Sequence, residues 1–159
     1  KVDNRVFTAS SKMPRAAKYA ELKYNKEAST ADRTIVTAVY QDIPETSDFY
    51  WFEQYVNNIK LSGYDVTNDE FTGGMNVSKD IIFKNSLNNG SYMIKSGDKI
   101  RVDMNCIDPS AYNYFFSLYN ANGFALNGLA PSNPVSNISG GALGIFSAHT
   151  QQSKTIIVP

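Results

Sequence analysis

Residues Asn133 to Phe146, N-P-V-S-N-I-S-G-G-A-L-G-I-F, are the stretch from which the fold of this chain is worked out. Proline disfavours the α region for the residue before it, so Asn133-Pro134 favours an extended or turned backbone. Gly140-Gly141 then allows backbone angles that are closed to other residues. An apolar run follows directly from Ala142. We therefore expect a structured turn that leads into a buried strand of a mainly β domain.

Strand patterns extend from this stretch through most of the chain. Lys99 to Cys106 alternates apolar and polar residues, which predicts a half-buried strand. Thr34 to Tyr40 is rich in β-branched residues, and Phe49 to Asn57 is rich in aromatic ones, so both are expected to be strands. A hairpin between these two is the simplest topology, followed by an extended loop with short pairing segments from Asn57 to Gly74. Further short strands are expected at Ile81 to Phe83, Tyr92 to Ile94, Leu143 to His149 and Thr155 to Val158, with a tight turn at Asn88-Asn89-Gly90.

One segment has the pattern of a helix. Asp108-Pro109 provides an N-cap acceptor followed by proline at the first helical position. Tyr112, Phe115, Phe116 and Tyr119 then share one helical face, which would pack against a sheet. The predicted fold is an antiparallel β-sandwich or twisted sheet with one amphipathic helix at about residues 108–120.

Length and charge limit the classes of protein to which the chain can belong. Its 159 residues suffice for one domain with a core, and its net charge is zero. No basic stripe favours nucleic-acid binding, and no apolar run approaches the roughly 20 residues that span a bilayer. Residues 1–33 have weak periodicity, although Lys18 to Lys26 has the pattern of an exposed strand or short helix. We expect residues 1–33 to form an N-terminal arm or interdomain connection, and residues 34–159 to form the β-rich domain.

The C-terminal stretch also carries a family resemblance. Together with a terminal strand at Lys154 to Val158, it resembles the C-terminus of a Bacteroidetes family of outer-membrane lipoproteins of unknown biochemical function. These are often encoded beside SusC/SusD-like TonB-dependent transporters. Other segments resemble the family in the same order, so that the resemblance covers roughly residues 34 to 158: Asp48 to Phe52, Asp69 to Gly74, Gly97 to Val102 and Ala111 to Leu118.

This resemblance implies a function and a location. It implies a non-catalytic accessory lipoprotein of a nutrient-uptake complex, anchored by a lipid at the bacterial cell surface, with a SusC/SusD-like transporter as its protein partner and a peptide or glycan as its ligand. Family members usually carry a lipidated cysteine and an N-terminal immunoglobulin-like or related β domain. This chain starts at Lys1 without a leader or that cysteine, so we expect a removed N-terminus or a short member. A hydrolase with its site in such an N-terminal region is a further hypothesis.

No residue pattern indicates an enzyme, a cofactor or a metal site. Cys106, the chain's one cysteine, fits a buried core thiol, and His149, its one histidine, fits a solvated turn. Paired acids could make a glycosidase, but Glu53 and Asp103 are expected on outward, solvated strand faces. The oxygen-rich group of Asp65, Asn68, Asp69 and Glu70 could bind calcium, but it lacks EF-hand spacing and is interpreted as a solvated turn.

The aromatic strand offers a candidate contact surface. Phe49, Trp51, Glu53 and Tyr55 fall on one face of the strand, and Tyr50 falls on the other with further apolar residues. One interpretation is a strand that the fold covers on both sides, in part with the aromatic helix. The other is a platform that stacks on sugars or anchors a protein partner. A stand-alone carbohydrate- or peptide-binding module is therefore the alternative function, with Trp51, Tyr50 and Tyr55 as the candidate contact residues.

Overall fold

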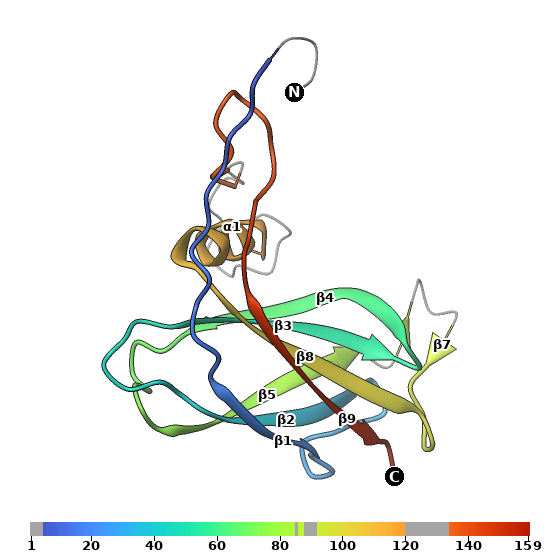
Figure 1. Ribbon diagram of the computed structural model, residues 1–159. Helices are drawn as coiled ribbons and strands as arrows, with labels where there is room; N and C mark the ends of the chain where they lie inside the picture. The colour runs from blue at the N-terminus through green and yellow to red at the C-terminus, as the bar shows by residue number, and fades with distance from the viewer. Residues whose placement is uncertain (1–4, 85, 88–91, 120–133) are drawn as a thin grey trace, which may run out of the picture.

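The computed structural model describes residues 5–84, 86–87, 92–119 and 134–159 of the chain. Two antiparallel sheets pack together, with one short helix beside them (Figure 1). The three-stranded sheet has the order β1 (Lys18–Tyr24), β2 (Arg33–Gln41) and β5 (Asn76–Lys84). The four-stranded sheet has the order β4 (Ile59–Asn68), β3 (Phe49–Val56), β8 (Lys99–Ile107) and β9 (Thr150–Ile157). The other elements are β6 (Ser86–Leu87), which pairs with β7 (Tyr92–Met93), and the helix α1 (Pro109–Tyr119).

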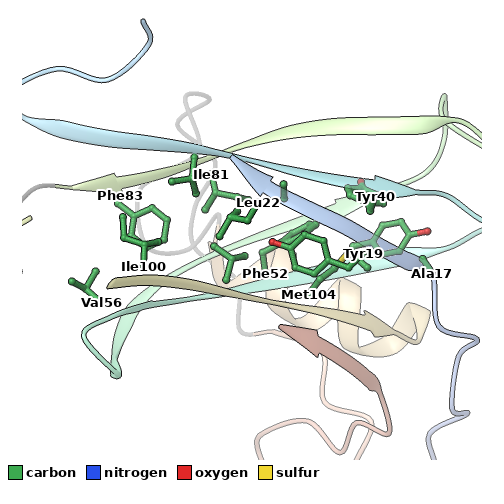
Figure 2. Close-up of a cluster of buried hydrophobic side chains, with 14 of the residues drawn as sticks. Ala17, Tyr19, Leu22, Tyr40, Phe52, Val56, Ile81, Phe83, Ile100 and Met104 are labelled. Atoms are coloured by element: carbon green, nitrogen blue, oxygen red, sulfur yellow. The ribbon is translucent and has the colours of Figure 1, made fainter. Parts of the chain in front are cut away.

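The hydrophobic core lies between the two sheets. Tyr40 of β2 contacts Phe52 of β3 across the core, with 5.8 Å between ring centroids. Figure 2 shows how both sheets contribute apolar side chains to one cluster, which includes Leu22, Phe52, Ile81, Phe83, Ile100 and Met104. Because each strand alternates its side chains between two faces, one face of every long strand can enter this cluster. The predicted mainly β fold with one helix is confirmed.

Strand β1 belongs to this core. It pairs with β2, and its side chains Tyr19 and Leu22 are buried. Gln152 of β9 joins β1 to the four-stranded sheet, because its side chain accepts a hydrogen bond from the backbone N–H of Tyr19 at 3.2 Å and donates one to the carbonyl of Ala17. Of the two alternatives for Lys18 to Lys26, an exposed strand or a short helix, the chain forms a strand, and this strand closes one side of the sandwich.

Two expectations about strand pairing are wrong. Strands β2 and β3 do not form a hairpin, since β2 pairs with β1 and β5 whereas β3 pairs with β4 and β8. The segment from Asn57 to Gly74 is more than an extended loop with short pairing segments, because Ile59–Asn68 is the ten-residue strand β4. A two-residue turn joins β3 to β4, and both its residues, Asn57 and Asn58, have positive φ (48° and 68°). This turn type suits a tight hairpin, and asparagine tolerates the left-handed region.

The helix begins where the sequence predicts. The Asp108 carboxylate accepts a hydrogen bond from the backbone N–H of Ala111 at 2.8 Å and another from the hydroxyl of Ser11. An N-cap acceptor and Pro109 at the first helical position therefore fix the start of α1. Just before the helix, Cys106 is buried, and burial raises the pKa of its thiol. Its predicted place in the core is confirmed.

The C-terminal stretch is a structured turn, but the strand expected at Leu143 to His149 is not formed. The Asn137 side chain instead hydrogen-bonds both backbone groups of Phe146. Its Nδ2 donates to the carbonyl at 2.7 Å, and its Oδ1 accepts from the N–H at 2.9 Å. Gly140 and Gly144 have positive φ (87° and 119°), which interrupts an extended backbone. The expected turn at Asn88-Asn89-Gly90 lies outside the described residues.

Replacing Leu22 by alanine tests the place of β1 in the core. We expect Leu22→Ala to lower the free energy of unfolding by about 2–4 kcal/mol, because it leaves a cavity between the sheets. The control is Lys23→Ala, since Lys23 is exposed and pairs only with the exposed Glu21; a change below about 0.5 kcal/mol is expected. Urea denaturation measures both. Equally small effects would show that β1 adds nothing to the folded core.

Candidate functional site

The outer face of the four-stranded sheet carries the chain's only tryptophan, Trp51. Helix α1 lies against this face. Phe115 stacks on the Trp51 ring, with 4.4 Å between centroids and 19° between planes, and Tyr112 contacts Phe49 at 4.9 Å. These contacts match the interpretation in which the fold covers the aromatic strand on both sides.

The three candidate contact residues do not share a surface. Tyr50 points into the core with no exposed area, and its hydroxyl donates a hydrogen bond to Asp42. Tyr55 is half-buried, with the Arg101 guanidinium 3.8 Å from its ring centroid. Trp51 is half-buried under Phe115. Because neighbouring residues of a strand face opposite sides, Tyr50 is removed from any binding platform that includes Trp51.

His149 is not the solvated turn residue that the sequence indicates. It is half-buried directly before β9. The His149 and Trp51 rings pack edge-to-face, with centroids 6.0 Å apart. The His149 Nδ1 is buried without a hydrogen-bond partner. The histidine therefore completes the aromatic packing around Trp51.

Glu53 and Asp103 are also misplaced by the sequence-based prediction, since both are buried. They lie directly opposite each other on β3 and β8. Lys60 forms an ion pair with Glu53, and this hydrogen bond raises the pKa of Lys60; the Arg101 Nε lies 3.0 Å from Asp103. The Asn105 amide donates to the backbone carbonyl of Trp51 at 3.2 Å. Each acid thus has a cation of its own, which is typical of a structural ion pair.

A second group of acids meets at the end of the sandwich where β2 ends and β3 begins. Asp42, Asp48 and Asp69 are buried, and each offers a carboxylate oxygen within 4.8 Å of the others. The sequence pointed only to Asp69 in this group, together with Asp65, Asn68 and Glu70. Asp65 lies elsewhere, where Gln54 donates to it at 3.1 Å and Lys79 lies 3.6 Å away. The signal that was missed is that each of the three acids directly flanks a strand: one follows β2, one precedes β3 and one follows β4.

Five of the twelve exposed large apolar side chains of the described residues lie on two segments beside α1, namely the arm (residues 5–16) and the strap (residues 134–149). The arm and the strap run side by side, away from the sheets (Figure 1). They are joined by hydrogen bonds between Thr8 and Ser139, including Ser139 N–H to the Thr8 carbonyl at 2.8 Å. Their exposed large apolar residues are Val6, Met13, Val135, Leu143 and Phe146, of which Leu143 is 82% exposed.

These features define a two-sheet antiparallel β domain with an exposed apolar surface and with partnered acids on its aromatic face. The chain belongs to the family described as a domain of unknown function, DUF4249, whose model matches residues 2–155. No curated protein matches the chain. No solved structure matches it either. Among the described residues, no helix has the length and apolar character needed to cross a membrane.

The stacking of Trp51 on Phe115 predicts a structural role for the tryptophan. We expect Trp51→Ala to lower the free energy of unfolding by about 2–4 kcal/mol, because the sheet and α1 lose their aromatic contact. A double-mutant cycle with Phe115→Ala should give a coupling of about 0.5–1.5 kcal/mol.

The matched control is a cycle of Trp51→Ala with Phe116→Ala, since Phe116 is exposed and stacks on Tyr112 instead. That cycle should give no coupling. Unchanged stability of Trp51→Ala, combined with lost binding of a peptide or glycan, would restore the platform hypothesis.

Proposed function

We propose that this chain is a non-catalytic docking domain, and that the protein carrying it is an accessory lipoprotein of a SusC/SusD-like uptake complex for peptide or glycan at the bacterial outer membrane. The observation that carries the docking role is the exposed apolar surface of the arm and strap. The transporter partner, the lipid anchor and the nutrient rest on the family resemblance of residues 133–146 and the segments before them. Membership of the DUF4249 family is consistent with this proposal.

The apolar surface supports docking on energetic grounds. Large apolar patches that remain in contact with water are typical of sites that bind another protein or a membrane. Covering apolar area stabilises a complex by roughly 25 cal/mol per Å². Val135, Leu143 and Phe146, all exposed on the strap, would therefore each contribute to binding if a partner covered them.

The hydrogen bonds of the strap support a preorganised surface. Asn137 holds the backbone of Phe146 and also donates to the carbonyl of Ser10 in the arm at 3.2 Å. A β-carbon at Gly140 would approach the Val6 carbonyl oxygen to 2.7 Å, so the two segments are in close contact there. A surface that is ordered before binding loses less conformational entropy when a partner docks.

A non-catalytic role is supported by the ion pairs of the buried acids on the Trp51 face. Glu53 and Asp103 are each paired with a cation, so neither is placed as a spare proton donor or acceptor. The alternative function, a peptide- or glycan-binding module centred on Trp51, is less favoured because Phe115 stacks on the indole ring.

The docking surface is tested by co-purification. The tagged full-length protein is recovered from a mild-detergent membrane extract, and its partners are identified by mass spectrometry. A TonB-dependent barrel and its SusD-like lipoprotein are expected. Leu143→Asp should reduce their recovery at least tenfold, which corresponds to about 1.4 kcal/mol, because a charge would then have to be desolvated in the interface.

The control is Ile82→Asp, since Ile82 is 50% exposed on β5, away from the arm and strap. Both variants should keep the melting temperature of a folded domain, and Ile82→Asp should keep the partners. Recovery of the protein alone, or equal recovery with both variants, would contradict the proposal.

A further inference from the structure

Three acids that are far apart in the sequence are brought together where the two sheets meet. Asp42 follows the last residue of β2, in the three-stranded sheet, whereas Asp48 and Asp69 flank β3 and β4 in the other sheet. Backbone hydrogen bonds hold this end in place: Asp42 N–H donates to the Met75 carbonyl at 2.9 Å, and Asp69 N–H donates to the Asp48 carbonyl at 3.2 Å. The convergence of the carboxylates is therefore built into the strand ends.

These acids lack a cation, as does the buried Asp108, which instead accepts hydrogen bonds from Ser11 and Ala111. Glu53, Asp65 and Asp103 each form an ion pair with a lysine or arginine. Among the described residues, no lysine or arginine forms an ion pair with the three clustered acids. The nearby Arg15 instead donates to the Thr46 hydroxyl at 3.1 Å. Burial of uncompensated charge is costly, so a cluster of three carboxylates calls for a positive ligand.

Asp69 provides a second and independent observation. Asp42 accepts hydrogen bonds from the hydroxyls of Tyr50 and Thr72, and Asp48 accepts one from Thr46. In contrast, no side chain or backbone N–H of the described residues donates to the Asp69 carboxylate, although Asp69 is only 8% exposed and directs an oxygen toward the other two acids. Buried polar groups normally have a partner in the protein or in water. The Asp69 carboxylate points into the cluster and lines an open hollow, so its partner must come from there.

The donor set and its spacing suit one kind of ion. Carboxylate oxygens are hard ligands that favour calcium, magnesium or manganese over zinc. Calcium binds oxygens at about 2.4 Å, so two ligands of one ion lie at most about 4.8 Å apart. The three oxygens meet this limit. An open hollow beside Asp69, lined by Glu45, Thr46, Ser47, Glu70 and Gly73, gives solvent access and room for the water ligands of the ion.

We propose that Asp42, Asp48 and Asp69 form a calcium-binding site that joins the end of β2 to the ends of β3 and β4. This differs from the sequence-based expectation of no metal. The argument for this site does not use the proposed docking function. Burial raises the pKa of Asp48, and the charges of Asp69 and Asp42 raise it further against the opposing effects of Thr46 and Arg15, which agrees with crowded carboxylates.

The test is calcium-dependent thermal stability of the purified chain after removal of metals with EGTA. An ion that binds only the folded state raises the melting temperature, and saturation with CaCl₂ should raise it by about 5–10 °C. MgCl₂ at the same concentration should give a smaller shift, because magnesium demands an octahedral site at shorter distances. Weak extracellular calcium modules have a Kd of roughly 1 mM. If CaCl₂ at a concentration about 10-fold above this Kd does not change the melting temperature, the proposal is wrong.

Asp69→Asn is the decisive variant, because it keeps the shape of the side chain and removes its charge. It should abolish the calcium shift. In EGTA it should melt at or above the temperature of the unmodified chain, since it relieves repulsion with Asp42 and Asp48. The matched control is Asp65→Asn, which changes a half-buried acid that lies outside the cluster and is paired with Lys79; this variant should keep the calcium shift. Retention of the shift in Asp69→Asn would overturn the proposal.

A second readout does not depend on the folding of any variant. Terbium replaces calcium in oxygen sites and is excited by nearby tyrosine, and the Tyr50 hydroxyl bonds Asp42 directly. The unmodified chain should therefore give tyrosine-sensitised terbium emission that CaCl₂ displaces. Emission that calcium does not displace would show adventitious binding and would contradict the site.

Discussion

The contact between Tyr40 and Tyr50, with ring centroids 4.9 Å apart, is the constraint on which the rest of the structure depends. The two tyrosines lie on strands that are consecutive in the chain but belong to different sheets. For both rings to enter one core, the chain must cross from one sheet to the other between Gln41 and Phe49. This crossing prevents the hairpin that the sequence suggests. It also leaves Asp42 and Asp48 at the end of the core, where both are buried.

Local signals in the sequence were sufficient for several elements. The Asp108-Pro109 pair predicted the start of α1, because an N-cap acts within one turn. The β-branched and alternating stretches predicted β2, β3 and β8 to within a residue or two. The hairpin of β3 and β4 had a local signal too, in Asn57-Asn58, but the polar composition after it was interpreted as a loop.

Pairing and burial could not be predicted in the same way, because they depend on residues far apart in the chain. Glu53 and Asp103 have the alternation of solvent-facing residues, yet each lies beside a cation on a strand that is buried on both faces. The apolar run after Gly141 has the composition of a strand, but Asn137 takes the backbone groups of Phe146 that a sheet would need. The sequence showed that the candidate platform at Trp51 is aromatic. It could not show that Phe115 covers Trp51, because this contact depends on where α1 packs on the sheet.

The proposed ion site and the proposed docking surface are physically connected through Arg15. This residue lies near the end of the arm and donates to the Thr46 hydroxyl, and its charge partly opposes the rise in the pKa of Asp48 that burial causes. Thr46 in turn donates to Asp48. A cation bound by the three carboxylates would cancel the attraction that holds Arg15 there and so loosen this end of the arm. Because linkage between two binding equilibria is reciprocal, a partner that draws the arm away from Thr46 would tighten cation binding by the same factor. Occupancy of the ion site would then change the position of the arm, and with it the surface that carries Met13 and the strap.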